Sequence, residues 1–166
     1  MNYENYLENV TEKLSYNFDI IENPDYDGVK FNLAAKSNIR NEKYIALKSA
    51  VIYAYENNEY CFFKILEDVN FKEVDKILEV LKKAANDFVE PHDEHMSTTF
   101  TGIIITQNPL ESDLKEKILK FKHQKSHKFG FHGWTSVRVV VVELSTGKVI
   151  ASKEAKNLDK FYAPII

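Results

Sequence analysis

The sequence contains few of the residues that mark special classes of protein. Among its 166 residues are one cysteine, five glycines and four prolines, which excludes collagen-like, low-complexity and disulfide-rich proteins. The single cysteine, Cys61, cannot form an internal disulfide, and this fits a reducing cytoplasm. The longest apolar runs, such as 102–105 and 139–142, are far shorter than the roughly 20 residues that span a membrane. We therefore expect a cytoplasmic protein with no membrane-spanning segment and no secretory leader.

Arginine is also scarce. The chain has 20 lysines but two arginines, beside 14 asparagines and 14 isoleucines, as expected of an AT-rich coding sequence. Under that bias, Arg40 and Arg138 are candidates for positions where a planar, bidentate guanidinium is needed. The alternative is that neither arginine has a special role.

Apolar residues make up 44% of the chain and aromatic residues 13%, enough for a sizeable core in one domain spanning residues 1–166. Helical spacing of these residues predicts a helix near the N-terminus, one over 71–89, and one from 109 to about 124 or 128. Asn108 is the expected N-cap of the last helix, and Asn70 that of the helix before it.

The predicted strands differ in character. Residues 100–106 and 137–143 are apolar throughout, which predicts strands that are buried on both faces. Shorter strands precede them, and Glu56-Asn57-Asn58-Glu59 is typical of a tight hairpin turn. The fold class is therefore α+β, a single domain with a central mixed β-sheet packed by three α-helices.

The most distinctive polar stretch, residues 91–97, lies between a predicted helix and a buried strand. His92, Glu94 and His95 bring together imidazole and carboxylate groups that can form part of a three-ligand metal site. A divalent metal would be the cofactor, with His123 and His127 as further ligands. One alternative is general acid–base catalysis by a histidine. The other, which we favour, is a structural role in capping the preceding helix and bonding the loop backbone.

A second candidate is the segment 120–134, in which lysines alternate with aromatic residues. Lysines can neutralise phosphates while aromatic rings stack on bases. The candidate ligand-binding residues are Lys122, Lys125, Lys128, Trp134, Arg138 and Arg40. Four phosphate contacts would give a slope of log affinity against log salt of roughly −3 to −4. The alternative, which we favour, places Phe121, Phe129 and Trp134 in the core.

Charge is unevenly distributed along the chain. Residues 1–30 contain seven acids and two lysines, whereas residues 115–138 contain six lysines, one arginine and one glutamate. Such polarity either steers an anionic partner to one face or pairs the acidic helix with the basic segment inside the fold. We favour internal pairing. The net charge of −3 likewise makes nucleic acid an alternative partner and not the favoured one.

Two resemblances follow from these patterns. The order of a helix, an antiparallel strand group, a helix and a buried strand resembles the restriction-endonuclease-like fold. That resemblance implies an acidic residue on one strand and a Glu-x-Lys or Asp-x-Lys motif on the next. Here Lys64 is the lysine of the matching strand, but Phe62 stands two positions before it, so the sequence departs from the nuclease motif.

The second resemblance is to an uncharacterised bacterial protein family, and it covers roughly residues 5 to 162. It is carried by four phrases, which are Arg40-Asn41-Glu42-Lys43-Tyr44, Glu56-Asn57-Asn58-Glu59-Tyr60, Pro91-His92-Asp93-Glu94-His95-Met96 and Phe129-Gly130-Phe131-His132-Gly133-Trp134. It implies a stand-alone cytoplasmic protein of unknown function and assigns no catalytic role to any residue.

The sequence thus predicts a ligand- or partner-binding domain of unassigned activity, with residues 91–97 and 121–138 as its functional surface. One alternative is a protein that binds nucleic acid or a phosphorylated ligand. Another is a metal- or histidine-dependent, hydrolase-like enzyme. A third is a homo-oligomer whose surface tyrosines and phenylalanines form the interface.

Overall fold

The computed structural model describes residues 1–44 and 51–164, with side-chain burial and contacts given outside residues 41–55. Its elements, in chain order, are α1 (Tyr3–Ser15), β1 (Asp19–Glu22), β2 (Asp25–Tyr26), β3 (Val29–Lys30), β4 (Leu33–Tyr44), β5 (Val51–Ile65), α2 (Phe71–Asp87), β6 (His95–Thr106), α3 (Ser112–Lys120), β7 (His123–Ser126), the 3₁₀ turn η1 (Lys128–Gly130), β8 (Trp134–Glu143), β9 (Lys148–Ala151), the 3₁₀ segment η2 (Lys153–Leu158) and α4 (Asp159–Tyr162).

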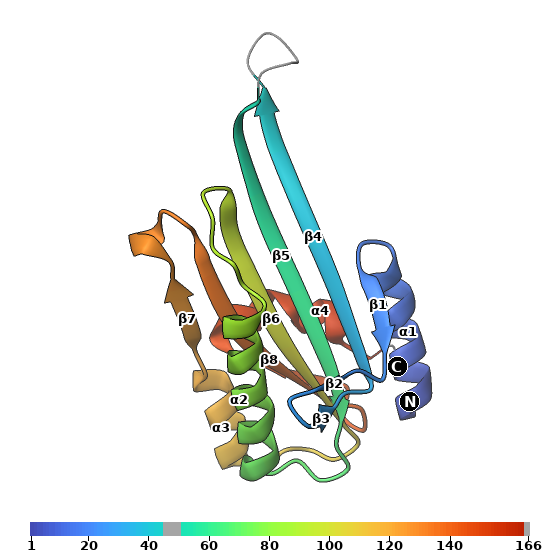
Figure 1. The fold of residues 1–166 in the computed structure, drawn as a ribbon. Coiled ribbons are helices and arrows are strands. Elements are labelled where there is room, and N and C mark those ends of the chain that lie inside the picture. The colour runs from blue at the N-terminus through green and yellow to red at the C-terminus, as the bar shows by residue number, and fades with distance from the viewer. Residues whose placement is uncertain (45–50, 165–166) are drawn as a thin grey trace.

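A mixed sheet occupies the centre of the molecule (Figure 1). In the described part of the chain its strand order is β1-β4-β5-β6-β8-β7, and β9 also pairs with β8. The strand β4 runs antiparallel to both of its neighbours, β1 and β5. The strands β5, β6 and β8 run parallel because α2 and α3 form the crossovers. This confirms the predicted α+β fold with a central mixed sheet, to which the short α4 is added.

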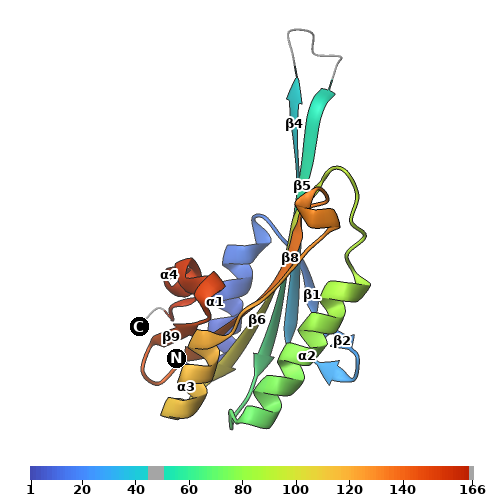
Figure 2. The same cartoon turned by 90° about the vertical axis from the view of Figure 1, so that its left-hand side faces the viewer.

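Helices cover both faces of the sheet (Figure 2), so the core has two layers. On one face α2 and α3 pack on Phe100, Ile104 and Val139, and on the other α1 and α4 pack on Ile103 and Val140. Neighbouring residues such as Ile103 and Ile104 pack into different layers because successive side chains of a strand point to opposite faces. Residues 100–106 are buried throughout, and 137–143 nearly so, which confirms that both strands are covered on both faces.

The helix over 71–89 begins as predicted. The side chain of Asn70 accepts a hydrogen bond from the backbone N–H of Glu73 at 3.1 Å, which satisfies one of the unpaired donors of the first turn. The predicted start of the helix after residue 108, which is α3 in the structure, was wrong. The N-cap of α3 is Glu111, not Asn108, and Glu111 makes no side-chain capping bond.

Two further boundaries differ from the predictions for a common reason, which is strand pairing over long sequence distances. Residues 56–59 are not a turn but lie within β5, paired with β4 on one side and β6 on the other. The helix α3, predicted to reach residue 124 or 128, ends at Lys120, because residues 123–126 form the edge strand β7 against the start of β8. In both segments tertiary pairing outweighs the local preference of polar residues for turns or helix.

The strands β4 and β5 extend beyond their neighbours as a two-stranded arm, which we define as residues 37–44 and 51–55. β1 pairs with β4 over residues 33–36, and β6 first meets β5 at Glu56. In both views the arm reaches past the loop between β7 and β8 (Figures 1 and 2). In the described part of the chain, no helix is long and apolar enough to cross a membrane.

Candidate functional site

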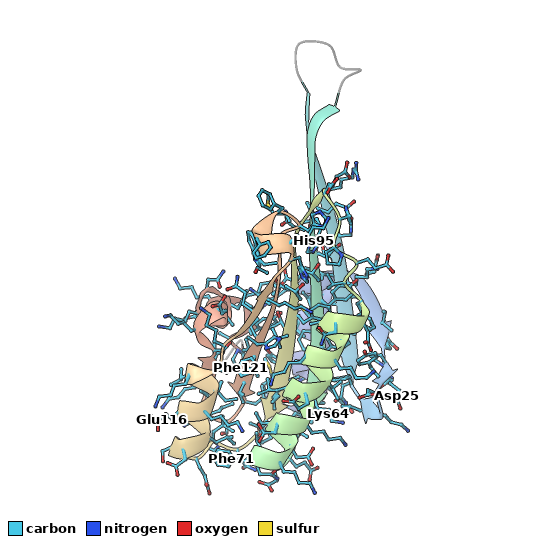
Figure 3. All side chains as sticks on the ribbon, turned by 60° about the vertical axis from the view of Figure 1, so that its left-hand side comes forward. Asp25, Lys64, Phe71, His95, Glu116 and Phe121 are labelled. Atoms are coloured by element: carbon cyan, nitrogen blue, oxygen red, sulfur yellow. The ribbon has the colours of Figure 1, made fainter. Side chains whose placement is uncertain are left out.

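Four of the five histidines gather at the end of the sheet where β6 and β8 begin, close to the base of the arm; Figure 3 shows His95 there. The ring centroids of His92 and His95 are 6.2 Å apart, and those of His95 and His127 are 5.7 Å apart. His132 joins the cluster through its backbone carbonyl, which contacts the His95 ring. The sequence brings them together because β6 and β8 are parallel neighbours.

His95 is buried and both of its ring nitrogens are hydrogen bonded. Its Nδ1 lies 2.6 Å from the carbonyl oxygen of His132, and its Nε2 lies 2.9 Å from the hydroxyl of Thr98. Since a carbonyl only accepts, we infer that Nδ1 carries the proton and that Nε2 accepts from the threonine. This fixed tautomer makes His95 a structural link between the two loops.

His92 lies in a chain of polar contacts at the rim. Its Nε2 is 3.3 Å from a carboxylate oxygen of Glu56, and its Nδ1 accepts from the backbone N–H of Glu94 at 3.3 Å. Arg40 bridges the two acids, 3.0 Å from Glu56 and 2.6 Å from Glu94. The guanidinium of Arg40 thus ties β5 to the loop before β6 through two different carboxylates.

The side chains of the other two histidines in the cluster, His132 and His127, also contact polar groups of the protein. His132 lies 2.8 Å from a carboxylate oxygen of Asp93, and His127 lies 2.7 Å from the hydroxyl of Thr135. Burial, reinforced by the neighbouring His95 and then Lys125, lowers the pKa of His127 below its ordinary value. We therefore expect His127 to be neutral at pH 7.

The three predicted metal ligands are not arranged around one point. Glu94 pairs with Arg40, His92 with Glu56, and both nitrogens of His95 are occupied within the fold. Among the side chains that the structure describes, no group of three or more His, Cys, Asp or Glu residues is placed to hold a metal ion. Of the two further ligands expected, His127 joins the cluster, but its Nε2 is engaged by Thr135, whereas His123 lies apart on β7. Burial and the nearby charge of Lys82 lower the pKa of His123.

A pocket opens beside the cluster, on the face of the sheet that α2 covers. We call it the end pocket; it has a volume of about 260 Å³. Its lining residues are Lys36, Asn38, Asn58, Tyr60, Phe88, Val89, Glu90, His92, His95 and Thr98. Alternate positions of β4 and β5 face it, opposite the C-terminal end of α2. The polar residues of β4 and β5 were missed as site residues, although their alternate spacing (36, 38 and 58, 60) was visible.

The candidate basic residues do not form one surface. Lys122 lies 3.8 Å from Glu154, whereas Lys125 lies 3.3 Å from the amide oxygen of Asn86 on α2. Arg138 is largely buried, where its Nε donates to the hydroxyl of Thr101 and its terminal nitrogen pairs with Glu59. The guanidinium fork of Arg138 is therefore used inside the fold.

The aromatic residues of the same segment lie at the surface. Phe129 is 100% exposed, Phe131 83% and Trp134 42%, so the expectation that Phe129 and Trp134 belong to the core was wrong. Phe121 does pack against the core, as expected. We call residues 127–133 the aromatic loop. The exposure of this loop could not be predicted from the sequence, because an aromatic residue near glycines is equally consistent with a buried turn.

The acidic and basic segments lie apart. α1 and β1 belong to one edge of the sheet and β7 to the other (Figure 1), and no described ion pair joins residues 1–30 to residues 115–138. The expected internal pairing of these segments was therefore wrong. The acids of residues 1–30 do not neutralise the basic edge.

Cys61 is fully buried on β5, as its apolar neighbours predict. Burial, helped by the charge of Glu59, raises the pKa of the Cys61 thiol to about 12. The thiol is therefore protonated at neutral pH and is not a nucleophile.

The fold and the site define an α+β domain with a polar pocket at one end of its sheet. The chain belongs to a family described as a domain of unknown function (DUF8052), whose model matches residues 2–164. This confirms the resemblance to an uncharacterised family. No curated protein and no solved structure matches the chain, so the resemblance to the restriction-endonuclease-like fold stays a prediction.

Proposed function

We propose that this protein is a ligand-binding domain that takes a small anionic molecule, bearing a phosphate or a carboxylate, into the end pocket. The main observation behind this proposal is the position of the Lys36 side chain. Its ammonium group faces the pocket, 5.6 Å from the centre of the Tyr60 ring, and has no carboxylate partner among the described side chains. A ligand anion would supply that partner through a charge-assisted hydrogen bond.

The rest of the pocket suits an organic ligand better than a bare ion. Asn38, Asn58 and Thr98 offer amide and hydroxyl groups, while Phe88 and Val89 offer apolar surface. The Tyr60 ring is stacked on the buried Phe100, with centroids 4.8 Å apart and planes 4° apart, so its position is fixed before a ligand arrives. The lining is mainly polar, with one apolar wall at Phe88 and Val89, so it suits a polar ligand that has a small apolar part.

The hydrogen bonding of the histidines favours binding over acid–base catalysis. A general base needs a ring nitrogen that can reach the substrate. Both nitrogens of His92 and both nitrogens of His95 already face partners within the protein. We therefore assign these two residues to shaping the pocket, and Lys36 to holding the ligand.

Replacing Lys36 with methionine is expected to weaken binding of an anionic probe about tenfold or more, because it removes a charged hydrogen bond while keeping most of the length of the side chain. The probes are AMP, ribose 5-phosphate, inorganic phosphate and benzoate, titrated by calorimetry. Binding of the first three but not benzoate would assign the site to phosphates, and the reverse to carboxylates.

The matched control is Lys148→Met, which removes an exposed lysine from a strand at the opposite end of the sheet. It should leave affinity unchanged. Failure of every probe to bind the wild-type protein at millimolar concentration, or equal affinity of the Lys36 and Lys148 variants, would contradict the proposal.

A further inference from the structure

The aromatic loop is held rigidly in the conformation that exposes its rings. Backbone hydrogen bonds close it on itself, including His127 N–H to the carbonyl of Gly133 at 2.9 Å and Gly130 N–H to the carbonyl of His127 at 2.9 Å. The His95 ring also donates to the carbonyl of His132 at 2.6 Å, which ties the loop to β6. The display of Phe129 and Phe131 is thus a property of an ordered loop.

The backbone conformation that displays these rings is unfavourable. Lys128 and Phe129 have φ values of 45° and 56°, in the left-handed region that residues with a Cβ seldom adopt. Phe129 gains no burial from it, since its side chain is fully exposed. Local strain that the packing of the protein does not explain is typical of functional positions. A ligand that covers the rings would offset the strain.

The charge around the loop indicates an anionic ligand. From residue 117 to residue 142 the sequence contains six cations and no acid. Several of the cations are already paired: Lys117 with Asp75, Lys120 with Glu116, Lys122 with Glu154 and Arg138 with Glu59. Lys125 and Lys128 have no carboxylate partner among the described side chains, and both lie within three residues of the start of the loop.

The shape of the molecule disfavours a membrane as the anionic partner. The arm reaches past the aromatic loop at the same end of the molecule, in both perpendicular views (Figures 1 and 2). A flat bilayer approaching that end would meet the arm before it met the loop. A single strand of nucleic acid is flexible and can reach the exposed rings beside the arm, and each of its bases offers a flat ring to a phenyl group.

We propose that the aromatic loop binds single-stranded nucleic acid, with bases stacked on Phe129 and Phe131 while Lys125 and Lys128 contact phosphates. Trp134, which begins β8 next to the loop, borders the same surface. This site differs from the basic segment expected from the sequence, because Lys122 and Arg138 are engaged elsewhere. It is also separate from the end pocket and does not depend on the ligand proposed there.

The test is a titration of the full chain with fluorescein-labelled 12-mers of poly(U), poly(dT) and a DNA duplex at low salt. We expect binding of the single strands with a slope of log affinity against log salt of about −1.4, since two phosphate contacts contribute about −0.7 each. Fluorescence of Trp134, the single tryptophan, should be quenched on binding, which gives a readout that needs no variant.

Replacing Phe129 and Phe131 together with serine should weaken binding at least about tenfold and leave the salt slope unchanged, because it removes stacking but no charge. The Lys125→Ala/Lys128→Ala variant should flatten the slope towards zero. The control is Tyr16→Ser, an aromatic residue that is 79% exposed at the end of α1. Lys36→Met should also leave oligonucleotide binding unchanged, which separates this proposal from that of the end pocket.

Absence of binding by the wild-type protein at 100 micromolar would overturn the proposal, as would equal affinity of the phenylalanine double variant and Tyr16→Ser. The same variants are also tested for binding to vesicles in which half of the lipid is phosphatidylglycerol. Phenylalanine-dependent binding to vesicles, without binding to single strands, would assign the loop to membranes and reject nucleic acid.

Discussion

Replacing Gly133 with alanine should lower the free energy of unfolding by about 3 kcal/mol, measured by urea denaturation. Gly133 has a φ of 70°, and a Cβ built there would lie 2.1 Å from the backbone oxygen of Met96 and 2.7 Å from that of His95. The atoms in the way are main-chain atoms of β6, which cannot move aside as a flexible side chain can. Gly133 is therefore what allows the aromatic loop to lie against β6.

Gly130→Ala is the matched control for this prediction. Gly130 also has a positive φ, of 93°, but nothing lies within 4 Å of the position of its Cβ. Its replacement should cost only the conformational strain, about 1 kcal/mol. The difference between the two variants isolates the close approach of the loop to β6. Equal losses in the two variants would show that this contact does not stabilise the protein.

Replacing Glu143 with alanine should lower the free energy of unfolding by about 2–4 kcal/mol, because it leaves buried partners unsatisfied. Glu143 is fully buried at the end of β8, and its carboxylate accepts from the backbone N–H of Leu110 at 2.8 Å and from the hydroxyl of Thr146 at 2.8 Å. The ammonium of Lys115 lies 3.1 Å away. The control is Glu116→Ala, an exposed acid whose loss should leave stability nearly unchanged.

The same carboxylate should make stability depend on pH. Burial by itself would raise the pKa of Glu143, but the bonds from Leu110, Thr146 and Lys115 outweigh it and hold the pKa below its ordinary value of 4.5. The unfolded chain therefore binds a proton at a higher pH than the folded protein does. The stabilisation from Glu143 is complete well above pH 4.5 and is lost as the pH falls through the folded-state pKa.

Glu143→Gln tests this assignment. Glutamine cannot titrate, so the fall in wild-type stability between pH 6 and pH 3 should become shallower in this variant. Unchanged pH dependence would mean that other carboxylates control acid unfolding.

The sequence was most informative where local and global preferences agree. The helix α2 was predicted with its N-cap because Asn70, Glu73 and the spacing of Val74, Ile77 and Leu81 all indicate the same structure. The strands β6 and β8 were predicted from uninterrupted apolar runs, which only a sheet covered on both faces can bury. In such segments no distant partner is needed to decide the structure.

The sequence was least informative where polar residues find distant partners. Asn57 and Asn58 favour a turn locally, yet they lie within β5. There the flanking Glu56 and Glu59 pair with Arg40 and Arg138 on other strands. The residues of the end pocket come from two adjacent strands, a helix end and a loop, so no short motif marks them. The left-handed conformation of Phe129 was not predictable either, because residues with a Cβ seldom adopt it and position 129 holds a phenylalanine.

The central claim is that the end pocket binds a small anion, and amide chemical shifts of the wild-type protein during an AMP titration test it most directly. We expect the shifted amides to cluster at Lys36, Asn38, Asn58, Tyr60 and Thr98, which line the pocket from three adjacent strands. Saturable shifts confined to the opposite end of the sheet, around residues 67–71 and 106–114, or no shifts at millimolar AMP, would contradict the account.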